Sequence, residues 1–181
     1  MSTIVIDETT REPQTGPVLP TAIKWGVISA AFSFLFLLVT YNLGLMDMSG
    51  GFGTTAIVGL VAIVIGIGIL VLGMKEYRDK VLGGRMTWVQ GLVYALAYGA
   101  VATLLGLVLS YVFYAFLAPN YFEEMAAGMT TMMEDFGADD DAIAAAIADL
   151  NLSGVLTSQA IQGFVGTAVI GAIVAAVLKR S

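Results

Sequence analysis

Four long runs of apolar residues constrain this chain more than any other feature of its sequence. They cover residues 22–43, 56–74, 88–118 and 155–178. About 20 apolar residues suffice for a helix to cross the roughly 30 Å hydrocarbon core of a bilayer. Inside that core only helices and closed barrels satisfy every backbone amide and carbonyl. The sequence therefore predicts an all-α, polytopic membrane protein with four transmembrane helices.

The composition excludes several classes of function. Of the 181 residues, 58% are hydrophobic and only 12% are charged, whereas a soluble domain carries about 25% charged residues. The absence of Cys and His excludes disulfides, thiolate nucleophiles and histidine-bound metals. The net charge of −6 argues against a nucleic-acid partner, because phosphate binding needs clustered positive charge. We expect no enzyme activity, no cofactor and no metal site.

The segment at residues 75–85, KEYRDKVLGGR, predicts how the chain crosses the bilayer. It holds half of all the Lys and Arg residues, namely Lys75, Arg78, Lys80 and Arg85. Short loops rich in Lys and Arg stay in the cytoplasm, and these four cations can also contact lipid headgroups. Residues 120–152 contain acids but no Lys or Arg. We therefore predict a membrane protein with both termini in the cytoplasm and residues 120–152 on the opposite, outer side of the membrane.

The chain divides into a tail and one membrane domain. Residues 1–20 contain three prolines and several charges, which predicts a disordered cytoplasmic tail. Residues 21–181 are predicted to form a single four-helix domain, in which residues 120–152 make a short two-helix cap. The apolar stripe of that cap is Phe122, Met125, Met129, Met132, Met133 and Phe136. Methionine sulfur can bind Cu(I), but without His or Cys the stripe is interpreted as packing on the spans or on a partner.

Small residues recur along the spans at intervals of three, four or seven, which is typical of closely packed membrane helices. The glycines expected at helix contacts are Gly59, Gly66, Gly73, Gly91, Gly99, Gly106, Gly163 and Gly171. Thr87 and Gln90 have the spacing of a capping box, which places the start of the third span at that point. Gln159 and Gln162 are expected to hydrogen-bond across a pair of helices.

The predicted spans contain no acid, and their only cation, Lys24, is close enough to its span's end to reach the headgroups. Ion-coupled transporters usually keep ionisable groups at membrane depth. The sequence therefore favours a non-catalytic structural or accessory protein, in contact with the lipid bilayer and assembled as a homo-oligomer or within a larger membrane complex. The alternative is a channel, carrier or lipid-binding protein for a neutral or apolar solute, because glycine-lined helices can leave a groove.

Several short stretches carry a resemblance to a known family. They are Lys24-Trp25-Gly26, Lys75-x-Tyr77-Arg78, Gly83-Gly84, Met86-Thr87-Trp88-x-Gln90-Gly91, and Gly171 with Lys179 near the end. With these residues the chain resembles the bacterial membrane protein family called domain of unknown function 4199, found mostly in Bacteroidota. The resemblance covers residues 21–180. It implies the four-span architecture and a bacterial inner-membrane location, in which residues 120–152 would lie in the periplasm. It implies no catalytic or ligand-binding residue.

Overall fold

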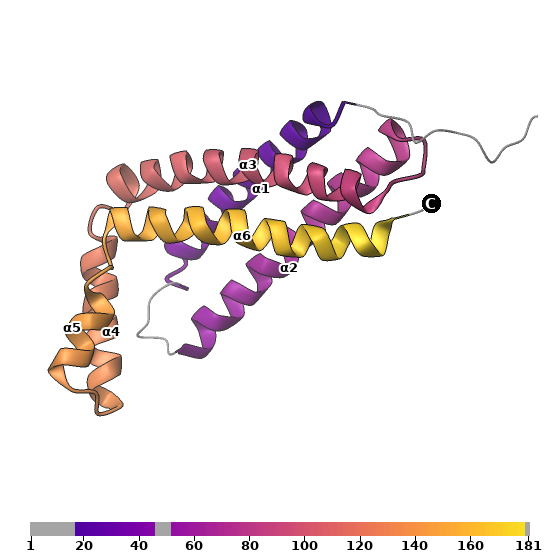
Figure 1. Cartoon of the computed structure of the whole chain (residues 1–181). Helices are drawn as coiled ribbons and strands as arrows, with labels where there is room; N and C mark the ends of the chain where they lie inside the picture. Colours follow the sequence, from indigo (N-terminus) through magenta and orange to yellow (C-terminus); the bar gives the residue numbers. More distant parts are fainter. Residues whose placement is uncertain (1–16, 46–51, 180–181) are drawn as a thin grey trace, which may run out of the picture.

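The computed structural model describes residues 17–45 and 52–179, and all regular structure in these residues is helical (Figure 1). The helices are α1 (Leu19–Asn42), α2 (Phe52–Glu76), α3 (Trp88–Val112), α4 (Tyr121–Asp135), α5 (Asp140–Ile147) and α6 (Leu152–Leu178). One π-helical turn extends α2 and another extends α3, namely η3 (Tyr77–Val81) and η4 (Phe113–Leu117). The predicted tail over residues 1–20 falls mostly outside the described residues, as does the connection 46–51.

Within the described residues, four helices are long and apolar enough to cross a membrane, and they cover Leu19–Asn42, Ala56–Val81, Trp88–Leu117 and Leu152–Leu178. This confirms the predicted four-span architecture with two shorter helices between the third and fourth spans. The second helix continues past the predicted end at residue 74. Glu76 and Lys80 stabilise this extension as an ion pair one turn apart. Part of the basic segment is therefore helical.

Local sequence signals explain where α3 begins. The Thr87 hydroxyl accepts a hydrogen bond from the Gln90 backbone N–H at 3.3 Å. The Gln90 side-chain oxygen accepts one from the Thr87 backbone N–H at 2.8 Å, so the predicted capping box is confirmed. Just before it, Gly83 and Gly84 have φ angles of 65° and 91°, in the region that glycine adopts without steric cost. These residues reverse the chain between α2 and α3.

Helix α3 is the centre of the bundle, because it packs against α1 on one side and α6 on the other. Glycines lie at the α3–α6 contact. A Cβ atom added to Gly91 would lie 2.6 Å from the Ala175 Cβ, and one added to Gly99 would lie 2.7 Å from the Thr167 Cγ2. The pairs Gly163 with Thr103 and Gly171 with Ala95 are similarly close. Any side chain at these glycines would force the two helices apart.

Two buried clusters hold the bundle, one at each end. At the end that carries the turn between α2 and α3, called here the basic end, the cluster includes Met74, Tyr77, Tyr94 and Ala175. At the opposite end, called the cap end, aromatic residues of η4 pack with the start of α4. The members of that cluster are Phe113, Tyr114, Ala118 and Tyr121, with Phe122 and Met125 against them.

Helix α2 belongs to the bundle mainly at the basic end. Leu70, Gly73 and Met74 are buried there, whereas Ile57 and Leu60 near the other end of α2 are exposed. In Figure 1 the start of α2 lies away from α6. The contact between the two helices is at the basic-end cluster, where Leu70 and Met74 of α2 are grouped with Val174 and Ala175 of α6. The diverging part of α2 contacts the bilayer on its outer side.

The two cap helices pack on one another beyond the ends of α3 and α6 (Figure 1). Asp139 caps α5 by accepting a hydrogen bond from the Ala142 N–H at 2.7 Å, and Ile143 is buried. Within the predicted cap stripe, Phe122 and Met125 pack on the cap-end cluster, and Met129, Met132 and Met133 are half-buried. Phe136 is 83% exposed, because it follows the last residue of α4, so the stripe is shorter than predicted.

Orientation in the membrane can be tested because the chain has no native Cys. We expect a membrane-impermeant maleimide to label Phe136→Cys in intact spheroplasts and to label Ser181→Cys only after lysis. The reason is the positive charge of the basic end, because segments rich in Lys and Arg are expected to stay in the cytoplasm. Labelling in the opposite order would contradict the predicted topology. Cys-free wild-type protein is the background control.

Candidate functional site

A cavity lies where α2 diverges from the other spans. Its volume is about 600 Å³, within the range of about 300–1,000 Å³ that is typical of small-molecule sites. We call this cavity the groove. Its walls include Ala30 and Leu37 of α1, Gly59 and Gly66 of α2, Gly106 of α3 and Gly163 of α6. The groove thus lies between all four candidate membrane spans.

The glycines predicted at helix contacts fall into two groups, which differ in whether a neighbouring helix is close to them. Gly73, Gly91, Gly99, Gly163 and Gly171 lie within contact distance of a neighbouring helix. At Gly59, Gly66 and Gly106, an added Cβ would meet nothing in the described chain within 4 Å, and all three line the groove. Because glycine has no side chain, these positions leave space that a ligand can occupy. The close helix contacts predicted there are not made between the described residues.

Stacked tyrosines close the groove toward the basic end. Tyr98 lines the groove, and its ring lies 6.3 Å from that of Tyr94, with 19° between the ring planes. The Tyr94 ring in turn stacks on Tyr77 at 5.3 Å and 18°. All three rings belong to the buried cluster of the basic end. The groove is therefore separated from the basic turn by close-packed aromatic side chains.

All of the described residues that line the groove are uncharged, and they include several hydroxyl and amide groups. Some of these polar groups have partners. Thr40 donates to the Phe36 carbonyl at 2.8 Å, Tyr98 has Ser29 as a hydrogen-bond partner, and Tyr114 of η4 has Gln159 of α6. The Gln159 contact joins two helices, as the sequence predicts. The hydroxyl and amide groups of the lining are of the kind that can hydrogen-bond to an uncharged polar group inside an otherwise apolar site.

Gln162 differs from Gln159, although the two lie one helical turn apart. It also lines the groove, but its side chain has no hydrogen-bond partner among the described residues. The expected contact across a helix pair is therefore not made at Gln162. Gln162 is exposed on a candidate membrane span, and an amide that faces lipid without a hydrogen-bond partner costs free energy. A ligand that hydrogen-bonds to this amide would remove that cost.

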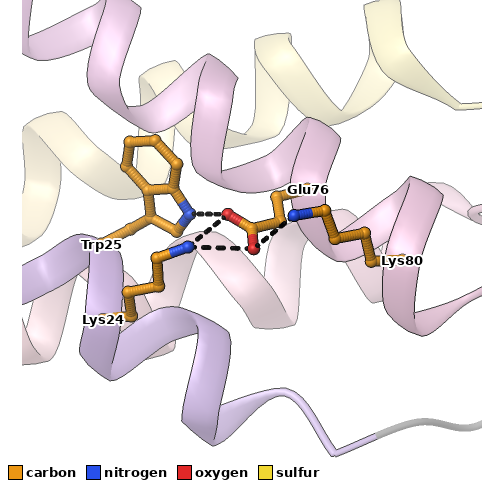
Figure 2. A network of polar contacts seen from close by, with 4 residues as sticks. All are labelled: Lys24, Trp25, Glu76 and Lys80. Carbon is orange, nitrogen blue, oxygen red and sulfur yellow. Dashed lines mark hydrogen bonds and ion pairs between the residues drawn. The ribbon is translucent and has the colours of Figure 1, made fainter.

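Four side chains from α1, α2 and η3 meet at the basic end and fix α2 there (Figure 2). The Lys24 Nζ lies 2.8 Å and 3.0 Å from the two carboxylate oxygens of Glu76. The Trp25 indole N–H donates to Glu76 at 2.8 Å, and Lys80 donates at 3.3 Å. We call Lys24, Trp25, Glu76 and Lys80 the Glu76 cluster. Three donors converge on a single carboxylate, which is more than an isolated surface ion pair provides.

Glu76 is the residue that sequence reasoning missed. With the second span ending at residue 74, the spans contained no acid and Lys24 was expected to reach the headgroups. The structure extends α2 to Glu76 and pairs Lys24 with it. A signal was present, because an acid four residues before Lys80 is typical of a helix. The sequence did not indicate that Lys24 and Trp25 would face Glu76.

The four predicted topology cations have different surroundings. Lys80 belongs to the Glu76 cluster. Arg78 is buried, donates to both carboxylate oxygens of Asp79 at 2.6 Å and 3.0 Å, and contacts the Leu178 carbonyl at the end of α6 at 3.5 Å. A cation at a helix C-terminus is favourable because the last carbonyls are unpaired. Lys75 and Arg85 are exposed and are available to headgroups.

The described residues contain no group of three or more His, Cys, Asp or Glu side chains that could hold a metal ion. Comparison with known families shows which family the chain resembles. The model of a family described as "Protein of unknown function (DUF4199)" matches residues 24–180. No curated protein and no solved structure matches the chain.

Substitution of Gly73 tests how closely α1 and α3 approach α2. A Cβ at Gly73 would lie 2.7 Å from the Trp25 Cγ and would also clash with the Tyr94 hydroxyl. We expect Gly73→Leu to lower the free energy of unfolding by about 1–3 kcal/mol, the usual cost of overpacking. Gly68→Leu is the matched control, because Gly68 lies on the same helix with open space around it. Equal stability of the two variants in detergent unfolding experiments would contradict the packing described.

Substitution of Glu76 tests the cluster itself. Glu76→Gln keeps the size of the side chain but removes the charge that Lys24 and Lys80 neutralise. We expect a lower thermal unfolding temperature in lipid nanodiscs, and faster proteolysis between α1 and α2. Glu123→Gln, at an exposed acid of α4, is the control and should behave like wild type. An unchanged Glu76→Gln protein would show that the cluster does not hold α2.

Proposed function

Since the chain belongs to the DUF4199 family, whose description assigns no activity, we propose from the geometry that it is a non-catalytic membrane protein that binds a lipid-like molecule in the groove. We further propose that it resides in a bacterial inner membrane with both termini in the cytoplasm. Lipid binding was the alternative function in the sequence analysis, which favoured a structural or accessory role.

The observation that carries the proposal is the groove at Gly59, Gly66 and Gly106. These glycines leave a volume of about 600 Å³ between the spans, and membrane helices gain stability chiefly by close packing. An unfilled space of this size forfeits those packing contacts. The bilayer surrounds the groove with acyl chains, which can fill a long apolar space. The uncharged lining suits such a molecule.

A second copy of the chain is the competing occupant. Self-association would also cover the glycines of α2, as in small-xxx-small helix pairs. The polar groups inside the groove favour a ligand over a second helix, because Ser29, Ser33, Thr103 and Gln162 are spread over three helices and at different depths. A helix seated there would need several polar residues of its own at matching positions. Within the described spans, most exposed positions carry leucine, isoleucine or valine.

Filling the groove with a side chain tests the proposal. Gly66→Leu adds a side chain that points into the groove, whereas Gly68→Leu adds the same side chain two residues away, at a position outside the groove lining. Purified protein in lipid nanodiscs is irradiated with a diacylglycerol that carries a diazirine in one acyl chain. Mass spectrometry of the peptides then locates the label.

We expect wild type and Gly68→Leu to be labelled on α3 and α6 around Gly106 and Gly163, and Gly66→Leu to be labelled there several-fold less. Equal labelling of the two leucine variants would contradict ligand binding in the groove. A wild-type protein that is dimeric in the nanodisc and takes no label in the groove would identify the second copy as the occupant.

A further inference from the structure

The polar groups of the groove are not evenly distributed. Toward the basic end, the hydroxyls of Tyr98 and Ser29 are partners of one another, and the tyrosine stack closes that end. Toward the cap end, Ser110, Gln159 and Gln162 line the groove together. Among the described residues that line the groove, only Gln159 and Gln162 carry a primary amide. The cap-end half is therefore the part that can recognise a polar head.

Charge restricts the kind of head that can be bound there. All described residues that line the groove are uncharged, and residues 86–178 contain no Lys or Arg at all. A phosphate placed at this depth would have no counter-charge, which is costly inside a membrane. The Lys and Arg residues that the structure describes lie at the basic end, beyond the tyrosine stack. An uncharged head, by contrast, needs only hydrogen bonds.

Gln162 supplies the specific contact. Its amide has no partner among the described residues and lines the groove, and it offers two N–H donors and one carbonyl acceptor. Resting on the proposed function, we infer that the groove binds an uncharged amphiphile. Its hydroxyl or carbonyl oxygens hydrogen-bond to Gln162 in the cap-end half, and its apolar chain extends toward Tyr98.

Recognition of the head sets the specificity of such a site. An acyl chain that moves from the bilayer into the groove exchanges one apolar environment for another. The transfer of the chain therefore contributes little free energy of binding. A hydrogen bond between groups in a membrane contributes about 0.6 kcal/mol on average and about 1.7 kcal/mol at most. Loss of the Gln162 contact should therefore weaken binding by about threefold to about twentyfold.

The experiment compares two lipids that differ only in the head. A diacylglycerol and a phosphatidylglycerol carry identical diazirine-bearing acyl chains, and each is presented in nanodiscs to wild type, Gln162→Leu and Ser158→Ala. Gln162→Leu removes the amide at similar side-chain size. Ser158→Ala is the control, because it removes a polar group of α6 that is exposed and lies outside the groove lining. Thermal unfolding of each variant verifies that it is folded.

We expect diacylglycerol to label the groove of wild type and Ser158→Ala more than phosphatidylglycerol does. Gln162→Leu should reduce the diacylglycerol label about threefold or more and leave the phosphatidylglycerol label unchanged. Equal labelling by both lipids, with no effect of Gln162→Leu, would overturn head recognition while leaving the proposed lipid binding intact. Preference for phosphatidylglycerol would also overturn it. Labelling of the groove by neither lipid would instead contradict the proposed function.

Discussion

The attachment of α2 at one end is the constraint on which the remaining structure depends. Glu76 at the end of α2 accepts hydrogen bonds from Lys24 and Trp25 of α1, and Gly73 one turn earlier lets Trp25 and Tyr94 approach the helix backbone. These contacts fix α2 at the basic end. Farther along, glycines replace the large side chains that would pack α2 onto α3 and α6, so the helix diverges and the groove opens.

The rest of the bundle provides a rigid frame for that groove. Helix α3 is held against α6 through Gly91, Gly99 and their partners on α6, and the aromatic cluster around Phe113 ties the cap to α1 and α3. The tyrosine stack limits how far a ligand can extend toward the basic end. The groove therefore has one wall formed by the closely packed helices α1, α3 and α6 and one wall formed by α2, which is held mainly at its basic end.

Much of the fold could be predicted from the sequence, because membrane spans and helix caps are encoded locally. The apolar runs located the four spans, and the spacing of Thr87 and Gln90 located the start of α3. The candidate site depends on contacts between distant parts of the chain. Lys24 and Glu76 are 52 residues apart, so no local pattern shows that they meet. Glycine spacing identifies one face of a helix but not its neighbour, which is why Gly66 beside the groove and Gly99 at a helix contact looked alike.

An experimental density map of the protein in lipid nanodiscs, obtained with a rigid binding partner that adds mass, tests the central claim most directly. The account predicts a single copy in which α2 meets the bundle at Glu76 and diverges beyond Gly66. Elongated density that belongs to no protein residue should fill the groove from Tyr98 to Gln162. A map in which α2 packs along α3 and α6 for its whole length, or in which a helix of a second copy fills the groove, would contradict it.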